Sequence, residues 1–150
     1  MRETIDQLAG ILGKYIPLLN KLSEAQLLAR KAPDKWSKKE ILGHLIDSAQ
    51  NNIRRFVIAQ YQENEKIVYA QDEWVKVANY HNYPTPQLIR LWTLLNQHMH
   101  IILQNMPEEK YRNICVTGEP HTIEWLAADY NKHLLHHLND ILELEPVAYP

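Results

Sequence analysis

Hydrophobic side chains recur at every third or fourth position along most of the chain, which is the period that predicts amphipathic helices. The first such stretch covers residues 4–28, although Pro17 lies inside it and is expected to kink or interrupt the helix. The second begins after Ser37, whose spacing to Glu40 is that of a capping box, and it continues to about residue 60.

Two further helices follow in the second half of the chain. One is predicted over residues 85–106 and the other over residues 122–144, where Thr122 can serve as the N-cap. Between the second and third helices, residues 64–84 have weak periodicity and form a long connection, with a helical turn expected around residues 72–79. A connection of this length inside a small domain is often functional.

Four helices joined by short turns and one long crossover predict an all-α fold, a four-helix bundle. The length of 150 residues suits a single domain, residues 1–150, that needs no disulfide or metal merely to fold. Sixteen Lys and Arg nearly balance eighteen Asp and Glu, which argues against nucleic acid as a partner. No apolar run approaches the roughly 18 residues of a membrane span. We expect a cytoplasmic protein, because no secretory signal is visible and the lone Cys115 cannot form an internal disulfide.

Histidine is the unusual feature of the composition, with eight residues against one cysteine. His133 and His137 are four positions apart and lie at the edge of, and within, the apolar arc of the last predicted helix. His136 and Asp129 fall on the other side, towards expected solvent. Two inward imidazoles cost solvation unless each finds a partner, so they either bind carbonyl or carboxylate groups or hold a metal ion together.

A polar stripe borders the apolar arc of the second predicted helix. It contains His44, Ser48, Asn51 and Arg55. Such a stripe is ordinarily a solvated flank, but it could also face another helix that carries inward histidines. In that case His44, His133 and His137 would supply three nitrogen ligands and leave a position open, which is the catalytic rather than the structural type of site.

The same segments resemble the DinB superfamily of four-helix proteins. Residues 36–48 and 51–56 resemble its first metal motif, and residues 129–137 resemble its second, with ligands at the first and last histidine. Residues 69–75 resemble the tyrosine–acid–tryptophan segment of the YfiT-like branch of metal-dependent hydrolases, which is related to bacillithiol transferases. The resemblance covers residues 5–142.

The resemblance implies a divalent metal ion, commonly zinc or nickel, bound in a cleft by His44, His133 and His137. It also implies thiol-transferase or hydrolase-like chemistry on small molecules, and frequently a homodimer. Asp140 stands where many members carry glutamine, which leaves the surroundings of the ligands open. Membership of a family does not by itself define an activity.

Two mechanisms fit an open three-histidine site, and we favour the first. In a transferase, the metal holds a low-molecular-weight thiol, of the bacillithiol type, as thiolate, and Arg55 and Asn51 could bind its carboxylate and amide. In a hydrolase, the metal activates a bound water, and Asp47 is the nearest general base in sequence, although helix geometry turns it further outward than Asn51. The rival hypothesis is a non-catalytic binding or dimerisation module with a vestigial site. Tyr69 and Trp74 are expected to cover the cleft.

Overall fold

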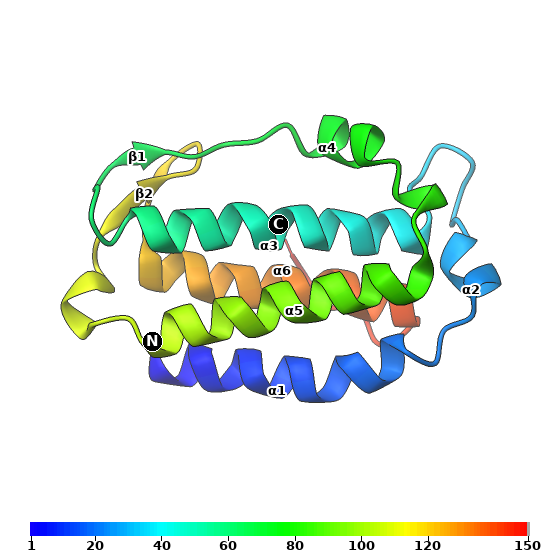
Figure 1. Cartoon of the computed structure of the whole chain (residues 1–150), viewed down its shortest axis with the longest axis horizontal. Coiled ribbons are helices and arrows are strands. Elements are labelled where there is room, and N and C mark those ends of the chain that lie inside the picture. The colour runs from blue at the N-terminus through cyan, green and yellow to red at the C-terminus, as the bar shows by residue number, and fades with distance from the viewer. Residues whose placement is uncertain (150) are drawn as a thin grey trace.

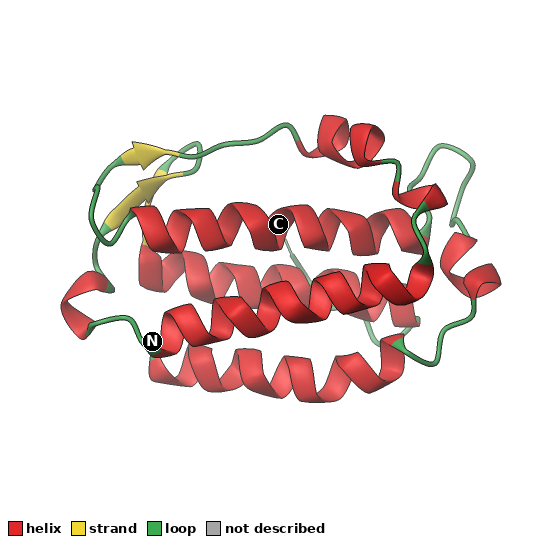
Figure 2. Ribbon diagram, viewed as in Figure 1, coloured by secondary structure: helices red, strands yellow, loops and turns green. Residues whose placement is uncertain are grey.

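The computed structural model describes residues 1–149; residue 150, the last of the predicted domain, lies outside the described residues. Four long helices form the bundle of Figures 1 and 2: α1 (Arg2–Leu19), α3 (Lys38–Ile58), α5 (Thr85–Gln104) and α6 (Ile123–Leu142). α3 and α1 each pack against both α5 and α6. Figure 1 shows α1 and α6 running in one direction and α3 and α5 in the other, so the predicted bundle with one crossover is confirmed. No helix within residues 1–149 combines the length and apolar character that crossing a bilayer requires.

The bundle is held by apolar side chains that each helix turns inward. Phe56 of α3, Trp92 of α5 and Leu134 of α6 are fully buried, and burying such side chains contributes roughly 1.5–3 kcal/mol each. Two polar contacts inside the core involve α6: Tyr130 donates a hydrogen bond to Asn96 of α5 at 2.6 Å, and Asn139 accepts one from a tyrosine of α1. Because polar partners must meet, these contacts fix how α6 is rotated in the bundle.

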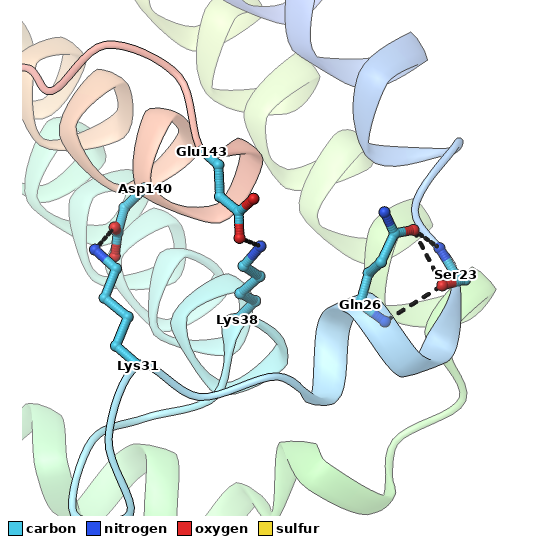
Figure 3. Close-up of polar contacts among 6 residues, drawn as sticks. All are labelled: Ser23, Gln26, Lys31, Lys38, Asp140 and Glu143. Atoms are coloured by element: carbon cyan, nitrogen blue, oxygen red, sulfur yellow. Dashed lines mark hydrogen bonds and ion pairs between the residues drawn. The ribbon is translucent and has the colours of Figure 1, made fainter.

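The first predicted helix is two helices. α1 ends at Leu19, with Pro17 inside its last turn, and α2 (Glu24–Leu28) follows at an angle to it. α2 has its own start signal: Ser23 and Gln26 form a capping box in which each side chain accepts from the other residue's backbone N–H (Figure 3). The interruption expected at Pro17 is present, but it lies after Leu19. The apolar pattern continues through residues 20–28, so it did not mark this position.

The crossover connection contains more structure than the sequence predicted. It comprises β1 (Glu65–Lys66), the expected helical turn as α4 (Gln71–Ala78), and a short 3-10 helix, η1 (Tyr80–Asn82). The connection from α5 to α6 holds η2 (Glu108–Lys110), β2 (Ile114–Val116) and β3 (Pro120–Thr122). β2 pairs in parallel with β1 and antiparallel with β3, so a small sheet joins the two connections at one end of the bundle. Strands of two or three residues are too short for an alternating pattern to predict them.

The start of α3 is held in place from two sides. Ser37 and Glu40 form the predicted capping box, with hydrogen bonds of 3.2 Å and 2.7 Å. Lys38 also pairs with Glu143, which follows α6, at 2.6 Å, and Lys31 of the preceding loop pairs with an acid on α6 (Figure 3). These contacts join the beginning of α3 to the end of α6, the two segments that carry the histidines.

Candidate metal centre

Three histidines meet where α3 packs against α6. His44 comes from α3, and His133 and His137 come from successive turns of α6. Each offers a ring nitrogen, and these three atoms lie within 4.8 Å of one another. The Nε2 atoms of His44 and His133 are 3.0 Å apart, and the ring of His44 lies edge-on to those of His133 and His137. The structure therefore brings together the three residues that the sequence singled out.

Burial keeps all three rings neutral at physiological pH. Desolvation lowers the pKa of His44 and of His137 to about 4. Desolvation, with smaller contributions from the neighbouring histidines, lowers the pKa of His133 to about 2. A neutral imidazole keeps one ring nitrogen with a free lone pair, which is the form that binds a metal. Three neutral rings whose nitrogens converge can each turn a lone pair towards a single cation.

The surroundings orient the rings unevenly. Ser48, one turn along α3 from His44, has its hydroxyl oxygen 3.4 Å from Nδ1 of His133, so a proton on Nδ1 would leave Nε2 free towards His44. Trp36 packs on the ring of His44 at a centroid distance of 5.2 Å, yet Nδ1 of His44 is buried with no hydrogen-bond partner among the described residues. Neighbouring groups of this kind commonly fix the rings of metal-binding histidines.

The donor set fits a divalent ion of the zinc or nickel type. Imidazole nitrogens suit both metals, whereas magnesium and calcium prefer oxygen ligands. Within residues 1–149 the cluster contains no cysteine and no carboxylate, so the chain offers three ligands rather than the four of a closed structural site. Such a site has room for a ligand from solution.

A cavity of about 460 Å³ opens beside His44 and His133. The crossover connection contributes Val68, Tyr69 and Gln71 to its wall, while α3 contributes Ser48, Asn52 and Arg55. α6 and the segments that flank it contribute aromatic and acidic groups, namely His121, Trp125, Asp129, Tyr130 and Tyr149. The expected aromatic cover is therefore partly present: Tyr69 lines the cavity, and Trp74 packs against the Tyr69 ring from outside, at a centroid distance of 5.5 Å.

Arg55 is the one predicted catalytic residue that lines this cavity. Its Nε and one terminal nitrogen donate to the carbonyl of Ile67 at 3.2 Å and 2.9 Å, and the other terminal nitrogen donates to Asn52 at 3.2 Å. Burial lowers its pKa, but a guanidinium remains protonated. Asn51, by contrast, is buried and donates to the backbone carbonyl of Asp47 at 2.9 Å, and it does not line the cavity.

Asp47 lies on another side of α3, against η1. Helix geometry predicted that Asp47 points outward, but Tyr80 covers it and donates a hydrogen bond to its Oδ1 at 2.5 Å. Its second oxygen is buried without a partner among the described residues, and burial raises its pKa to about 6, against the opposing effect of the Tyr80 hydrogen bond. The Tyr80 ring can approach because Gly43 has no side chain; a Cβ there would overlap the ring.

Several residues of the site escaped the sequence-based prediction, among them Asn52, Asp129 and Tyr149. Asn52 is next to the predicted Asn51, and Asp129 was expected in solvent on the outer side of the last helix. Tyr149 follows α6 and packs on the His133 ring at a centroid distance of 5.3 Å, while its hydroxyl donates to Asp129 at 3.0 Å. The segment after α6 also covers His136, whose Nδ1 lies 2.6 Å from the carbonyl of Val147. No periodic signal could have placed a segment without secondary structure over a helix.

A second cavity, of about 910 Å³, reaches the histidine cluster at His137. His137 lines it, together with Trp36 and the loop between α2 and α3. Gln71 contributes to the walls of both cavities. The cluster is thus approachable from two cavities.

Comparisons with known proteins agree with this architecture. The family model of the DinB superfamily matches residues 7–141. YfiT from Bacillus subtilis, described as a probable metal-dependent hydrolase with an unusual four-helix bundle topology, has a TM-score of 0.85 at 20% identity, over 95% of this chain and 83% of that one.

A mycothiol-dependent maleylpyruvate isomerase has a TM-score of 0.80 at 12% identity, over 93% of this chain, which spans 60% of the isomerase. A histidine-to-alanine mutant of that isomerase is similar at 11% identity with the same TM-score. No curated protein sequence matches the chain. At these identities the likeness to solved structures shows the fold.

Proposed function

The chain belongs to the DinB superfamily, and from this premise we propose that it is a metal-dependent enzyme that transfers a low-molecular-weight thiol to a small molecule. The observation that carries the proposal is the cluster of three neutral histidines, with ring nitrogens within 4.8 Å, in the wall of a cavity. The metal dependence ascribed to YfiT and the thiol dependence of the isomerase support it.

His44, His133 and His137 would hold a zinc or nickel ion. When bound, such an ion lowers the pKa of a thiol or water that reaches it. The protein contributes the remaining elements of the site. Ser48 orients the His133 ring, and Tyr69 and Tyr149 restrict access of bulk water.

Arg55 would bind an anionic group of the substrate, because its guanidinium lines the cavity and its hydrogen bonds go only to neutral acceptors. We assign Asn51 and Asp47 a different part in the same site. Asn51 binds the backbone of α3 one turn away, and Asp47 binds η1 through Tyr80. Both would position the helix that carries His44 and Arg55 rather than touch the substrate.

Transfer between two molecules is favoured by two cavities that reach the cluster, one at His44 and His133 and the other at His137. A hydrolase needs only one organic substrate, but it needs a general base for water. Asp129 supports this second candidate function, because it lines the first cavity one turn from His133. Hydrolysis therefore remains the alternative, with Asp129 rather than Asp47 as its base.

A cobalt-loaded sample separates the two candidates. We expect a sulfur-to-metal charge-transfer band when L-cysteine, glutathione or bacillithiol is added, because cobalt reports a sulfur ligand by its absorption. Proton release on binding should accompany the band. Full metal occupancy without a band for any of the three thiols would refute the transferase and favour hydrolysis. Absence of any metal binding would refute both and leave a non-catalytic module.

A further inference from the structure

The cavity beside His44 and His133 contains one cation and one anion, Arg55 and Asp129. Among the described residues, neither side chain has an oppositely charged group within 4.0 Å. Both side chains are only partly buried, so both are accessible to a ligand in the cavity. Two opposite charges that share a cavity without meeting therefore leave space for a ligand between them.

Arg55 has two N–H groups without an acceptor among the described residues. Three of its five N–H groups donate to the carbonyl of Ile67 and to Asn52, and both acceptors are neutral. One N–H remains on each terminal nitrogen. A carboxylate matches such a pair with two parallel hydrogen bonds, and it also neutralises the charge that the protein leaves unpaired.

Asp129 has one occupied and one free oxygen. Its Oδ2 accepts from the hydroxyl of Tyr149 at 3.0 Å, and Oδ1 has no donor among the described residues. The Tyr149 contact holds the carboxylate in one orientation. A protonated amine supplies both the donor and the charge that Oδ1 lacks.

His44 and His133 line the same cavity as these two charges. Asp129 precedes His133 by one turn of α6, about 6 Å along the axis. α3 runs antiparallel to α6 beside it, so Arg55 lies towards the same end of the cavity as Asp129, away from His44. Cysteine carries its amine and its thiol on adjacent carbon atoms, so one molecule would present both groups to this cavity.

We propose that this cavity recognises an amino-acid head group, with the carboxylate on Arg55 and the protonated amine on Asp129. The side chain of that amino acid then points towards the three histidines. That this side chain is a thiol rests on the proposed function. The ligand is then of the cysteine type, with a free amine and a free carboxylate. Glutathione, whose cysteine has neither a free amine nor a free carboxylate, fits this arrangement less well.

Isothermal titration with four probes tests the proposal on both metal-free and zinc-loaded protein. The probes are L-cysteine, cysteamine without the carboxylate, 3-mercaptopropionate without the amine, and L-serine without the thiol. On zinc-loaded protein, L-cysteine should bind at least about tenfold more tightly than either single-charge thiol, since each missing contact is a hydrogen bond between charged groups. Equal affinity for all three thiols would overturn the proposal.

Two variants give a crossed pattern that general damage to the fold would not produce. Arg55→Met should lower the affinity for L-cysteine to that for cysteamine and leave the affinity for cysteamine unchanged. In Asp129→Asn the amide oxygen can still accept from Tyr149. This variant should lower the affinity for L-cysteine to that for 3-mercaptopropionate and leave the affinity for 3-mercaptopropionate unchanged. Arg54→Met is the matched control, because Arg54 is exposed and does not line the cavity.

If Arg55→Met fails to fold, Arg55→Lys keeps the charge but loses the paired N–H groups, and it should reduce the preference for L-cysteine without abolishing it. Loss of both single-charge probes together with L-cysteine in either variant would contradict the assignment.

Metal-free protein distinguishes this proposal from the proposed function. L-serine should bind there, and Arg55→Met should abolish the binding, because head-group recognition needs no metal. If zinc-loaded protein binds L-cysteine no more tightly than L-serine, the transferase proposal is refuted while the head-group site is retained. If cobalt reports a sulfur ligand but L-cysteine has no advantage over cysteamine and 3-mercaptopropionate, the head-group site fails and the transferase stands.

Discussion

Gly43 and Asp47 lie one turn apart on α3, and both meet Tyr80. The glycine leaves space for the ring, and the carboxylate accepts from the hydroxyl. The apolar pattern predicted α3 correctly but placed Asp47 on its outer side. Periodicity describes the faces of one helix and carries no information about the segment that packs over it. The crossover connection supplies that cover, and its weak pattern gave no register from which Tyr80 could be placed.

Replacing Gly43 by alanine should therefore destabilise the protein. The new Cβ would overlap the Tyr80 ring, and overpacking of this kind costs about 1–3 kcal/mol. Gly13→Ala is the matched control, since nothing lies within 4 Å of a Cβ there, and alanine in a helix should stabilise by about 0.5–1 kcal/mol. Urea unfolding of both variants measures the difference; equal free energies of unfolding would refute the close approach.

Asp47 predicts a dependence of stability on pH. Its folded-state pKa is about 6, above the ordinary value of 3.8, so between these values the folded chain keeps a proton that the unfolded chain releases. The contribution of Asp47 to stability is thus fully present below about pH 4 and is lost as pH rises through 6. Asp47→Asn cannot titrate, so its free energy of unfolding relative to wild type should rise between pH 4 and 7. A constant difference across urea titrations in that range would contradict this.

The helices differ in how clearly the sequence marks their ends. Ser37 with Glu40 and Thr122 mark the starts of α3 and α6, and both side chains accept the predicted capping hydrogen bonds. Pro17 predicted an interruption of the first helix, but the break lies after Leu19. Its position was not predicted although Ser23 and Gln26 carry the same kind of signal, because the apolar period continues across it. A local signal was outweighed there by a longer-range pattern.

Ser37→Ala should destabilise the chain by about 1 kcal/mol, because it leaves a backbone N–H at the start of α3 without its acceptor. The midpoint of urea unfolding measures the loss. Ser23→Ala removes the equivalent cap of the five-residue α2, where the residues are exposed and the bond is 3.3 Å, and should cost less. A larger loss from Ser23→Ala would show that α2, rather than the start of α3, limits stability.

For the molecule as a whole, we expect two bundles to associate. The homodimer implied by the family resemblance stays a prediction, and Leu94 and Ile101 on α5 are apolar side chains about half exposed. Light scattering should give twice the 17.7 kDa of one chain. A mass of 17.7 kDa across a wide concentration range would contradict it.

The arrangement of the whole bundle was predictable from four periodic segments, and so was the meeting of His44 with His133 and His137, because the motifs specify faces of helices. The cavity was not, since connections and the segment after α6 form much of its wall. Asp129 illustrates the limit. On an isolated helix it faces solvent, and Tyr149 and Arg55 make it part of a cavity only once the chain has folded.

Metal content of single-histidine variants tests the central claim most directly. Protein loaded with zinc, dialysed and analysed by elemental mass spectrometry should contain about one ion per chain, as a three-histidine site predicts. His44→Ala, His133→Ala and His137→Ala should each lose most of it. His136→Ala, next to the cluster, and His98→Ala, exposed on α5, should retain it. Equal loss from His136→Ala and His137→Ala, or full occupancy in the triple variant, would contradict the site.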